Sequence, residues 1–238
     1  MQATQHGQYL IQLTRWWVFN CYFVREEDGL TLIDSGLPGS AKAIMTAAAS
    51  LAAPIRRIAL THAHGDHVGS LDALAAALPK VEILFTARTA RFLAGDLSLD
   101  ADEPQAKLRG SFPRRQTQAS RYLQPGERVG SLEVIAAPGH SPDQVAFFDR
   151  RDGTLIAGDA FQSQGGLAVA GTVRWLFPLP AMATWHKDLA LQSARDLRQL
   201  NPSRLAVGHG SVIEQPQAMM DEAIGTAARG QAKSVALV

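Results

Sequence analysis

The chain has one cysteine, Cys21, among 238 residues, which excludes an intrachain disulfide framework. It has no excess of charge of one sign, because 23 lysine and arginine residues face 22 aspartate and glutamate residues. A dedicated nucleic-acid surface usually needs a clear basic excess. No apolar run approaches the about 18 residues of a membrane span, and residues 1–10 lack the apolar region of a secretory signal. We therefore expect a soluble, cytoplasmic protein that binds neither nucleic acid nor membrane.

What the chain does have is an ordinary globular composition, with 46% hydrophobic residues and length enough to bury a sizeable core. Apolar runs that alternate with helical patterns predict a sheet packed on helices, in one domain over residues 1–238. The predicted strands are residues 9–14, 18–24, 30–33, 55–60, 81–85, 132–136, 145–148, 154–157 and 205–207. The predicted helices are residues 40–53, 68–78, 181–200 and 215–229. The polar segment around His6 is expected to be flexible.

Residues 95–120 are less regular and hold several basic side chains around two prolines. We expect a solvated surface insertion here. A lid over a pocket, or a contact surface for an anion, are the alternatives.

A faint internal repeat joins two strand ends. Residues 30–36 and residues 153–159 each read as an apolar strand that ends at an acidic residue beside glycine. Two matching strand ends suggest two similar sheet halves that meet at a shared site.

The most informative segment is His62-Ala63-His64-Gly65-Asp66-His67, directly after a predicted buried strand. The whole chain has seven histidines, so three within six residues are improbable by chance. Residues i and i+2 of an extended segment project on one face, so His62 and His64 can reach one metal together. Gly65 permits a bend that would aim Asp66 and His67 at a second metal. Imidazole and carboxylate are ligands that suit zinc and other first-row metals.

Three further candidate ligands each follow a predicted strand and lie beside or near glycine: His140, Asp159 and His209. Loops at strand ends converge in sheet-based sites, so these side chains are expected to join the histidine cluster.

The His-x-His-x-Asp-His run, then Pro-Gly-His, Gly-Asp and Gly-His in that order, resembles the metallo-β-lactamase superfamily over about residues 9–213. The resemblance implies an α+β fold, an αββα sandwich of two mixed β-sheets flanked by helices, with the site at one edge where the sheets meet. It also implies two divalent metal ions, zinc first, with manganese, iron or cobalt as alternatives.

The same resemblance implies a role for each candidate ligand. The first ion would take His62, His64 and His140, the second would take Asp66, His67 and His209, and Asp159 would bridge both. Asp34, at a strand end beside the site, would orient the histidine loop by hydrogen bonds. Two close ions can share a hydroxide that attacks a carbonyl or phosphoryl centre, and Asp66 could also carry a proton to the leaving group.

The substrate pocket is expected from side chains near these ligands, although aromatic residues here could equally fill the core. The candidates are Trp16, Trp17, Phe161, Gln162, Trp175 and Phe177. Trp16 and Trp17 cannot both face inward in a regular strand, so at least one should meet solvent or a ligand.

The pattern resembles several branches of the superfamily and favours a small-molecule hydrolase that cleaves an ester, a lactone or a related substrate. Familiar lactonases carry a tyrosine where this chain has Gln162, and the chain ends too soon after His209 for the helical region of glyoxalase II. The alternatives are a thioester, β-lactam or phosphotriester hydrolase, or a metal-binding module without catalysis. A homodimer is compatible with the sequence.

Overall fold

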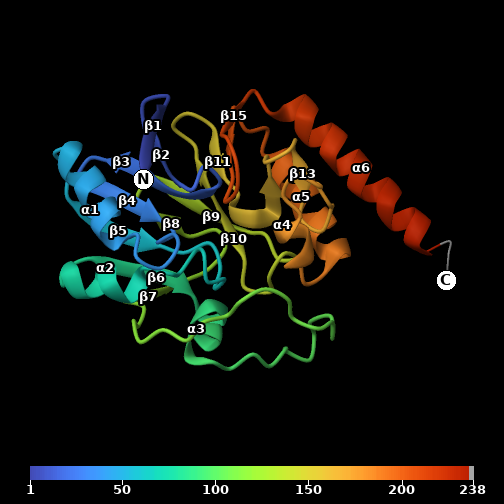
Figure 1. Ribbon diagram of the computed structural model, residues 1–238, viewed down its shortest axis with the longest axis horizontal. Helices are drawn as coiled ribbons and strands as arrows, with labels where there is room; N and C mark the ends of the chain where they lie inside the picture. Colours follow the sequence, from blue (N-terminus) through green and yellow to red (C-terminus); the bar gives the residue numbers. More distant parts are fainter. Residues whose placement is uncertain (236–238) are drawn as a thin grey trace.

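The computed structural model describes residues 1–235, and two β-sheets lie face to face at its centre between two groups of helices (Figure 1). The first sheet has the order β1-β2-β3-β4-β5-β6-β7. Its strands are β1 (Gln2–His6), β2 (Leu10–Arg15), β3 (Phe19–Glu26), β4 (Gly29–Ile33), β5 (Ile55–Ala59), β6 (Glu82–Thr86) and β7 (Arg121–Leu123). Strands β1 to β4 pair antiparallel and β4 to β7 pair parallel, so this sheet is mixed.

The second sheet has the order β15-β14-β11-β10-β9-β8. Its strands are β8 (Arg128–Val129), β9 (Leu132–Ala136), β10 (Val145–Asp149), β11 (Thr154–Ile156), β14 (Arg204–Ala206) and β15 (Ile213–Glu214). Only β11 and β14 pair parallel, and the other neighbours are antiparallel. A separate short hairpin joins β12 (Phe161–Gln162) to β13 (Ala168–Val169).

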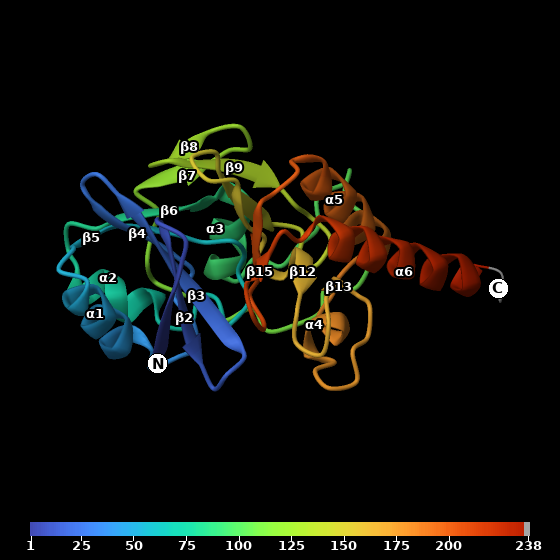
Figure 2. The same cartoon turned by 90° about the horizontal axis from the view of Figure 1, so that it is seen from above.

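Helices cover the outer face of each sheet (Figures 1 and 2). They are α1 (Ala41–Ser50), α2 (Leu71–Ala77) and α3 (Ala87–Ala94) beside the first sheet, and α4 (Leu179–Met182), α5 (Lys187–Gln199) and α6 (Gln217–Val235) beside the second. Neither α6 nor any other helix within residues 1–235 has the length and apolar character of a membrane crossing. The predicted αββα sandwich of mixed sheets is confirmed.

Side chains of the central strands point alternately toward the helices and toward the other sheet, so both faces of each sheet are buried. In β3, Phe23 packs toward the helices of the first sheet, whereas Tyr22 and Val24 point between the sheets. In β10, Phe148 faces the helices of the second sheet and Phe147 lies between the sheets. Successive side chains of a strand point to opposite faces, so a strand covered on both sides reads as an almost continuous apolar run.

Two local predictions were wrong, each for a tertiary reason, and several short elements were not predicted. His6 is not in a flexible segment, because it ends β1 and its Nε2 lies 3.1 Å from Gln12 Oε1. The elements that were not predicted are helix α3 and the strands β1, β7, β8, β12, β13 and β15. The helix expected at 181–200 begins at Lys187, because Trp185 N and His186 N donate to carbonyls of residues 140 and 139 and hold the chain extended there.

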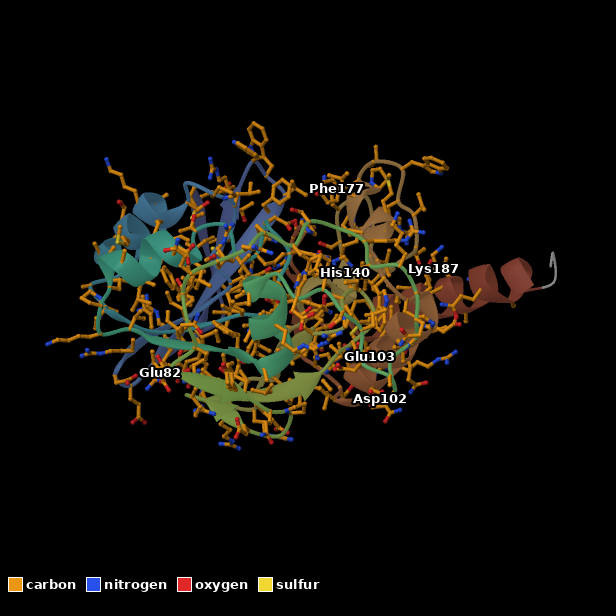
Figure 3. The ribbon with its side chains drawn as sticks, turned by 90° about the horizontal axis from the view of Figure 1, so that it is seen from below. Glu82, Asp102, Glu103, His140, Phe177 and Lys187 are labelled. Atoms are coloured by element: carbon orange, nitrogen blue, oxygen red, sulfur yellow. The ribbon has the colours of Figure 1, made fainter. Side chains whose placement is uncertain are left out.

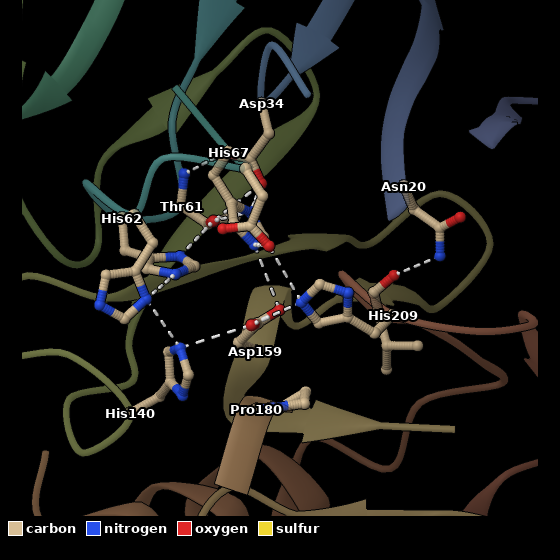
Figure 4. A network of polar contacts seen from close by, with 12 residues as sticks. Asn20, Asp34, Thr61, His62, His67, His140, Asp159, Pro180 and His209 are labelled. Carbon is tan, nitrogen blue, oxygen red and sulfur yellow. Dashed lines mark hydrogen bonds and ion pairs between the residues drawn. The ribbon is translucent and has the colours of Figure 1, made fainter. Parts of the chain in front are cut away.

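The faint repeat corresponds to the two strands β4 and β11, which lie inside their respective sheets. Asp34 directly follows β4, and Asp159 lies in a short 3₁₀ turn, Gly158–Ala160, after β11. Each sheet therefore delivers one buried carboxylate to the same edge of the sandwich (Figure 4).

Burial between the sheets predicts a large stability cost for truncation at Phe147, which is fully buried there. We expect Phe147→Ala to lower the free energy of unfolding by about 3–5 kcal/mol, from lost transfer energy and an unfilled cavity. Trp175→Ala is the matched control, because that ring is 90% exposed, and it should change stability by less than about 0.5 kcal/mol. Denaturant titration measures both, and equal losses would contradict the assigned core.

Candidate metal centre

All seven candidate ligands lie together at the edge of the sandwich where strands of both sheets end. Figure 4 labels five of them: His62, His67, His140, Asp159 and His209. Four come from the loop after β5, and the others follow β9, β11 and β14. Their donor atoms form three groups in which all atoms lie within 4.8 Å of one another: His62 with His64 and His140, His62 with His67 and Asp159, and Asp66 with His67 and His209. The long-range folding of the chain thus collects residues separated by up to 147 positions, from residue 62 to residue 209.

The first group is a trio of imidazoles, His62, His64 and His140. His64 Nδ1 lies 3.1 Å from His62 Nε2 and 3.0 Å from His140 Nε2. All three rings are buried. Three ring nitrogens therefore meet in a space that solvent does not fill.

The opposite nitrogen of each ring is held by an acceptor. His62 Nδ1 lies 3.0 Å from Thr61 Oγ1, whose own proton goes to Asp34 Oδ2. His140 Nδ1 lies 3.2 Å from Thr184 Oγ1, whose proton goes to the carbonyl of residue 180. His64 Nε2 lies 3.0 Å from the carbonyl oxygen of residue 109, which can only accept.

Because each outer nitrogen donates, each inner nitrogen is left with a lone pair and no proton. Three lone pairs at hydrogen-bond distance repel one another unless a cation lies among them. Burial supports the neutral form, since it lowers the pKa of His62 well below its usual range, that of His64 to about 4 and that of His140 to about 3. Neutral imidazole is the form that binds metal, so the trio fits a divalent ion.

The second group combines imidazoles with carboxylates. His209 Nε2 lies 3.0 Å from Asp159 Oδ2 and 3.3 Å from Asp66 Oδ2. His67 Nε2 lies 3.3 Å from Asp159 Oδ1 and 3.9 Å from Asp66 Oδ2. Burial alone would lower the pKa of both imidazoles, but the carboxylates raise the pKa of His209 to about 9 and that of His67 well above its usual range. Burial would also raise the pKa of Asp159, yet His209 and His67 hold it well below its usual range.

Asp159 lies between the two groups. Its Oδ2 is 3.4 Å from His140 Nε2 of the first trio, as well as 3.0 Å from His209 Nε2. Its Oδ1 is buried and accepts no hydrogen bond within the described residues. The buried Nδ1 of His209 likewise has no hydrogen-bond partner among these residues. His67 Nε2 lies 3.3 Å from Asp159 Oδ1 without forming a hydrogen bond, so a buried carboxylate oxygen this poorly satisfied fits a site that would hold a metal ion.

Asp34 fixes the loop that carries four of the ligands. Its carboxylate accepts from Thr61 N, from Thr61 Oγ1 and from His67 Nδ1, each at 2.8 Å. Its own backbone has a φ of 63°, a region that non-glycine residues seldom adopt. The carboxylate therefore orients His67 directly and His62 through the Thr61 hydroxyl, the contact predicted for it from the sequence.

A cleft of about 580 Å³ opens onto the ligands. His64, Asp66, His140, Asp159 and His209 line its floor. Its walls are mostly apolar and comprise Phe19, Leu37, Pro38, Pro113, Phe177, Leu179, Pro180, Met182 and Ala183, with Arg115 as the one lysine or arginine among the described lining residues. Phe19 and Phe177 both pack against the His209 ring, with centroids 5.2 Å apart in each case. Figure 3 labels Phe177 and His140 on the same side of the molecule.

Of the six predicted pocket residues, the structure places only Phe177 in this cleft. Phe161 and Gln162 are buried behind the site in β12, and Phe161 packs in the core of the second sheet. Trp16 and Trp17 turn outward at the β2–β3 hairpin with positive φ and line a separate hollow. Trp175 is 90% exposed and lines no cleft found within residues 1–235.

Several wall residues were missed from the sequence. Phe19 lies at the start of the predicted strand 18–24 and reads as core, Met182 lies in the predicted helix 181–200, and Leu179 lies just before that helix. Leu37 and Pro38 follow the acidic strand end at Asp34, which was the one available signal that they lie near the site.

The two-sheet sandwich and this donor set identify the class of the protein. It is an αββα sandwich with a candidate metal centre of the kind that metallo-hydrolases use. A family model described as the metallo-β-lactamase superfamily matches residues 14–209, and the chain belongs to that superfamily.

Similar proteins agree with this assignment. The chain is 50% identical over 212 residues to the uncharacterized protein YobT of Bacillus subtilis, which covers 89% of this chain and 91% of YobT. It is 30% identical over 215 residues to the probable metallo-hydrolase YflN of the same organism, which covers 81% of each. The solved structure of TTHA1623 in a di-iron-bound form matches with a TM-score of 0.64 at 25% identity, over 88% of this chain and 96% of that one.

The two groups should differ in how metal binding is linked to protons. At pH 7 the metal-free protein holds protons on His67 and His209, whose pKa values are raised, and ligation must displace them. We expect an ion bound by Asp66, His67 and His209 to release protons, with an affinity that rises with pH up to about 9. An ion bound by His62, His64 and His140 should release none, because the pKa of each ring already lies below 7.

Calorimetric zinc titration at pH 7, in two buffers of different ionisation enthalpy, measures this release. The His209→Ala variant is the control, since it should lose most of the buffer-dependent heat while the imidazole trio still binds. Buffer-independent heats in the unmodified protein would contradict the assigned protonation states.

Proposed function

We propose that this protein is a metal-dependent hydrolase with a dinuclear site, which cleaves a small ester, lactone or related substrate. The observation that carries the proposal is the convergence of three unprotonated imidazole nitrogens beside a second group of two imidazoles and a carboxylate, with Asp159 between them. The printed name of YflN, a probable metallo-hydrolase, supports metal-dependent hydrolysis, and the di-iron-bound form of TTHA1623 supports a site for two metal ions. We favour zinc, because nitrogen donors dominate, and manganese, iron or cobalt remain compatible.

Bound ions of this kind supply Lewis acidity and lower the pKa of a water ligand toward about 7, so that a nucleophile exists at neutral pH. The chain's own residues hold and orient that centre. Thr61 and Thr184 keep His62 and His140 in the tautomer that presents Nε2 inward. Burial of the imidazole trio excludes bulk water from one side of the site, so the substrate must approach through the cleft.

Asp66 is the candidate proton carrier. Its side chain is 26% exposed and lines the cleft, whereas the side chain of Asp159 is 3% exposed. Burial would raise the pKa of Asp66, but His67 and His209 hold it well below its usual range, so the carboxylate is ionised. The role rests on this position at the cleft, from which the carboxylate could take a proton and deliver it to a leaving group, and not on the low pKa, which makes Asp66 a weak base.

The apolar walls indicate the kind of substrate. Phe177 and Phe19 lie against the His209 ring, so an apolar acyl or aryl group beside the reacting carbonyl would contact them. Hydrolysis of a thioester, a β-lactam or a phosphotriester uses the same chemistry and is the alternative. A metal-binding module without catalysis is the alternative from another class.

A substrate panel tests the proposed activity. We expect metal-loaded protein to hydrolyse an aryl ester or a long-chain acyl-homoserine lactone faster than a glutathione thioester, a cephalosporin or an aryl phosphotriester. Turnover should disappear with a chelator and return on addition of zinc, because the ligands hold an exchangeable ion.

Two bound metals with no turnover on any substrate would contradict the hydrolase proposal and favour the non-catalytic module. An Asp66→Ala variant that keeps both metals and full turnover would contradict the proton-carrier role alone.

The position of Phe177 predicts a chain-length effect. We expect Phe177→Ala to lower kcat/KM for a long acyl ester by about 10-fold, since loss of a buried apolar contact weakens binding, and to change the acetyl ester by less than about 3-fold. Leu176→Ala is the matched control, because this neighbour is 82% exposed and does not line the cleft. If Phe177→Ala lowered kcat/KM equally for both esters, the Phe177 ring would not be part of the surface that binds the acyl chain.

A further inference from the structure

The segment 95–120 contacts the metal-binding loop at His64 and Gly65. Gly65 N donates to the carbonyl of Ser111 at 2.9 Å, and the Phe112 ring packs edge-on against the His64 ring with centroids 4.6 Å apart. Between these contacts, His64 Nε2 lies 3.0 Å from the Arg109 carbonyl oxygen. The insertion therefore encloses one imidazole of the trio from outside.

The Arg109 carbonyl fixes the chemical state of that ring. A carbonyl oxygen only accepts, so Nε2 of His64 carries the proton and Nδ1 keeps the lone pair that faces His62 and His140. His62 and His140 receive their outer partners from the threonine hydroxyls of Thr61 and Thr184. Among the three rings, His64 is the one whose outer partner comes from the insertion.

The close approach of this carbonyl depends on the next residue, Gly110. Gly110 has a φ of +89°, and a Cβ built on it would lie 2.4 Å from His64 Nε2 and 2.7 Å from His64 Cε1. No side-chain carbon can stand that close to a ring nitrogen, so any other residue here must displace the ring or the carbonyl. Glycine is required at this place for both reasons, the backbone angle and the space.

Contacts on both sides hold the insertion in place. Trp185 Nε1 donates to the Ala106 carbonyl at 3.0 Å, and Arg115 Nε donates to the Val68 carbonyl at 2.8 Å. Arg88 pairs with Glu103 further back along the segment. The stretch from Ala106 to Arg115 is thus fastened to the body of the protein at both ends, unlike a lid hinged at one side.

We propose that Gly110 is a positioning residue of the metal centre. By admitting the Arg109 carbonyl to His64 Nε2, it sets the tautomer and the aim of His64 and so the geometry of the first metal. Residues 109–112 are on this view a fixed wall of the site. The inference rests on the proposed metal binding by the imidazole trio and does not depend on which substrate is hydrolysed.

The tautomer of His64 is the first test, and it needs no variant. Long-range ¹⁵N–¹H correlation spectra of histidine-labelled, metal-free protein distinguish a protonated Nε2 from a protonated Nδ1, and the His64 signal is assigned by its loss in His64→Gln. We expect a protonated Nε2 at pH 7. A protonated Nδ1 would overturn the proposal, whatever the activity of the enzyme.

Gly110→Ala against Gly126→Ala is the second test. Gly126 has the same φ of +89° but no atom within 4 Å of a built Cβ, so both variants carry the same backbone strain and only Gly110→Ala crowds His64. We expect Gly110→Ala to weaken the first metal by about 10–100-fold and to alter the visible spectrum of the cobalt-substituted protein. Gly126→Ala should leave metal affinity and spectrum unchanged.

Equal metal affinities and equal cobalt spectra in the two variants would overturn the proposal. If Gly110→Ala does not fold while Gly126→Ala does, the tautomer measured in the unmodified protein decides alone. Absence of metal binding in the unmodified protein would contradict the proposed metal site itself, whereas intact binding without hydrolysis would leave the role of Gly110 in place and contradict only the proposed reaction.

Discussion

Three buried imidazole nitrogens that face one another at 3.0–3.1 Å form the constraint on which the rest of this structure depends. Their lone pairs repel, so two conditions favour the arrangement: the outer nitrogens are held in place, and a cation binds at the centre. The structure meets the first condition three times over with acceptors from different parts of the chain. A hydroxyl at residue 61, a carbonyl at residue 109 and a hydroxyl at residue 184 each take one ring proton.

The two sheets share the task of placing the donors. The first sheet delivers the histidine loop after β5 and Asp34 after β4, and the second delivers His140, Asp159 and His209. Packing between the sheets sets the distance between these two groups of donors. Ile33 lies one residue before Asp34 and Ile156 lies three residues before Asp159, and both isoleucines are in the core between the sheets. A shift in that core would separate donors of the same metal group. Stability of the sandwich and geometry of the centre are therefore coupled.

The loops around the cleft determine how a small molecule reaches the candidate metal ligands. Charge is concentrated on the floor of the cleft and the walls are apolar, apart from Arg115. The walls come from loops that differ in origin: the β2–β3 hairpin, the turn after β4, the insertion before β7 and the segment around α4. Such loops can vary without disturbing the donors, which explains how one fold serves many substrates.

The sequence by itself determined the candidate metal ligands and the order of the elements that carry them. The run His62 to His67 is local, its spacing fixes which side chains share a face, and the later ligands stand at strand ends that apolar patterning reveals. The αββα fold followed from the resemblance that these motifs carry. The apolar walls of the cleft and the outer hydrogen-bond partners of the three imidazoles were decided only by the tertiary structure. From the sequence, Phe19 is interpreted as a core residue and Gly110 as a loop glycine. The residues next to them in the sequence give no sign that Phe19 contacts His209 or that Gly110 contacts His64. Such contacts, 46 positions apart for His64 and Gly110, exist only after the sheets have packed and the insertion has been fastened across the site.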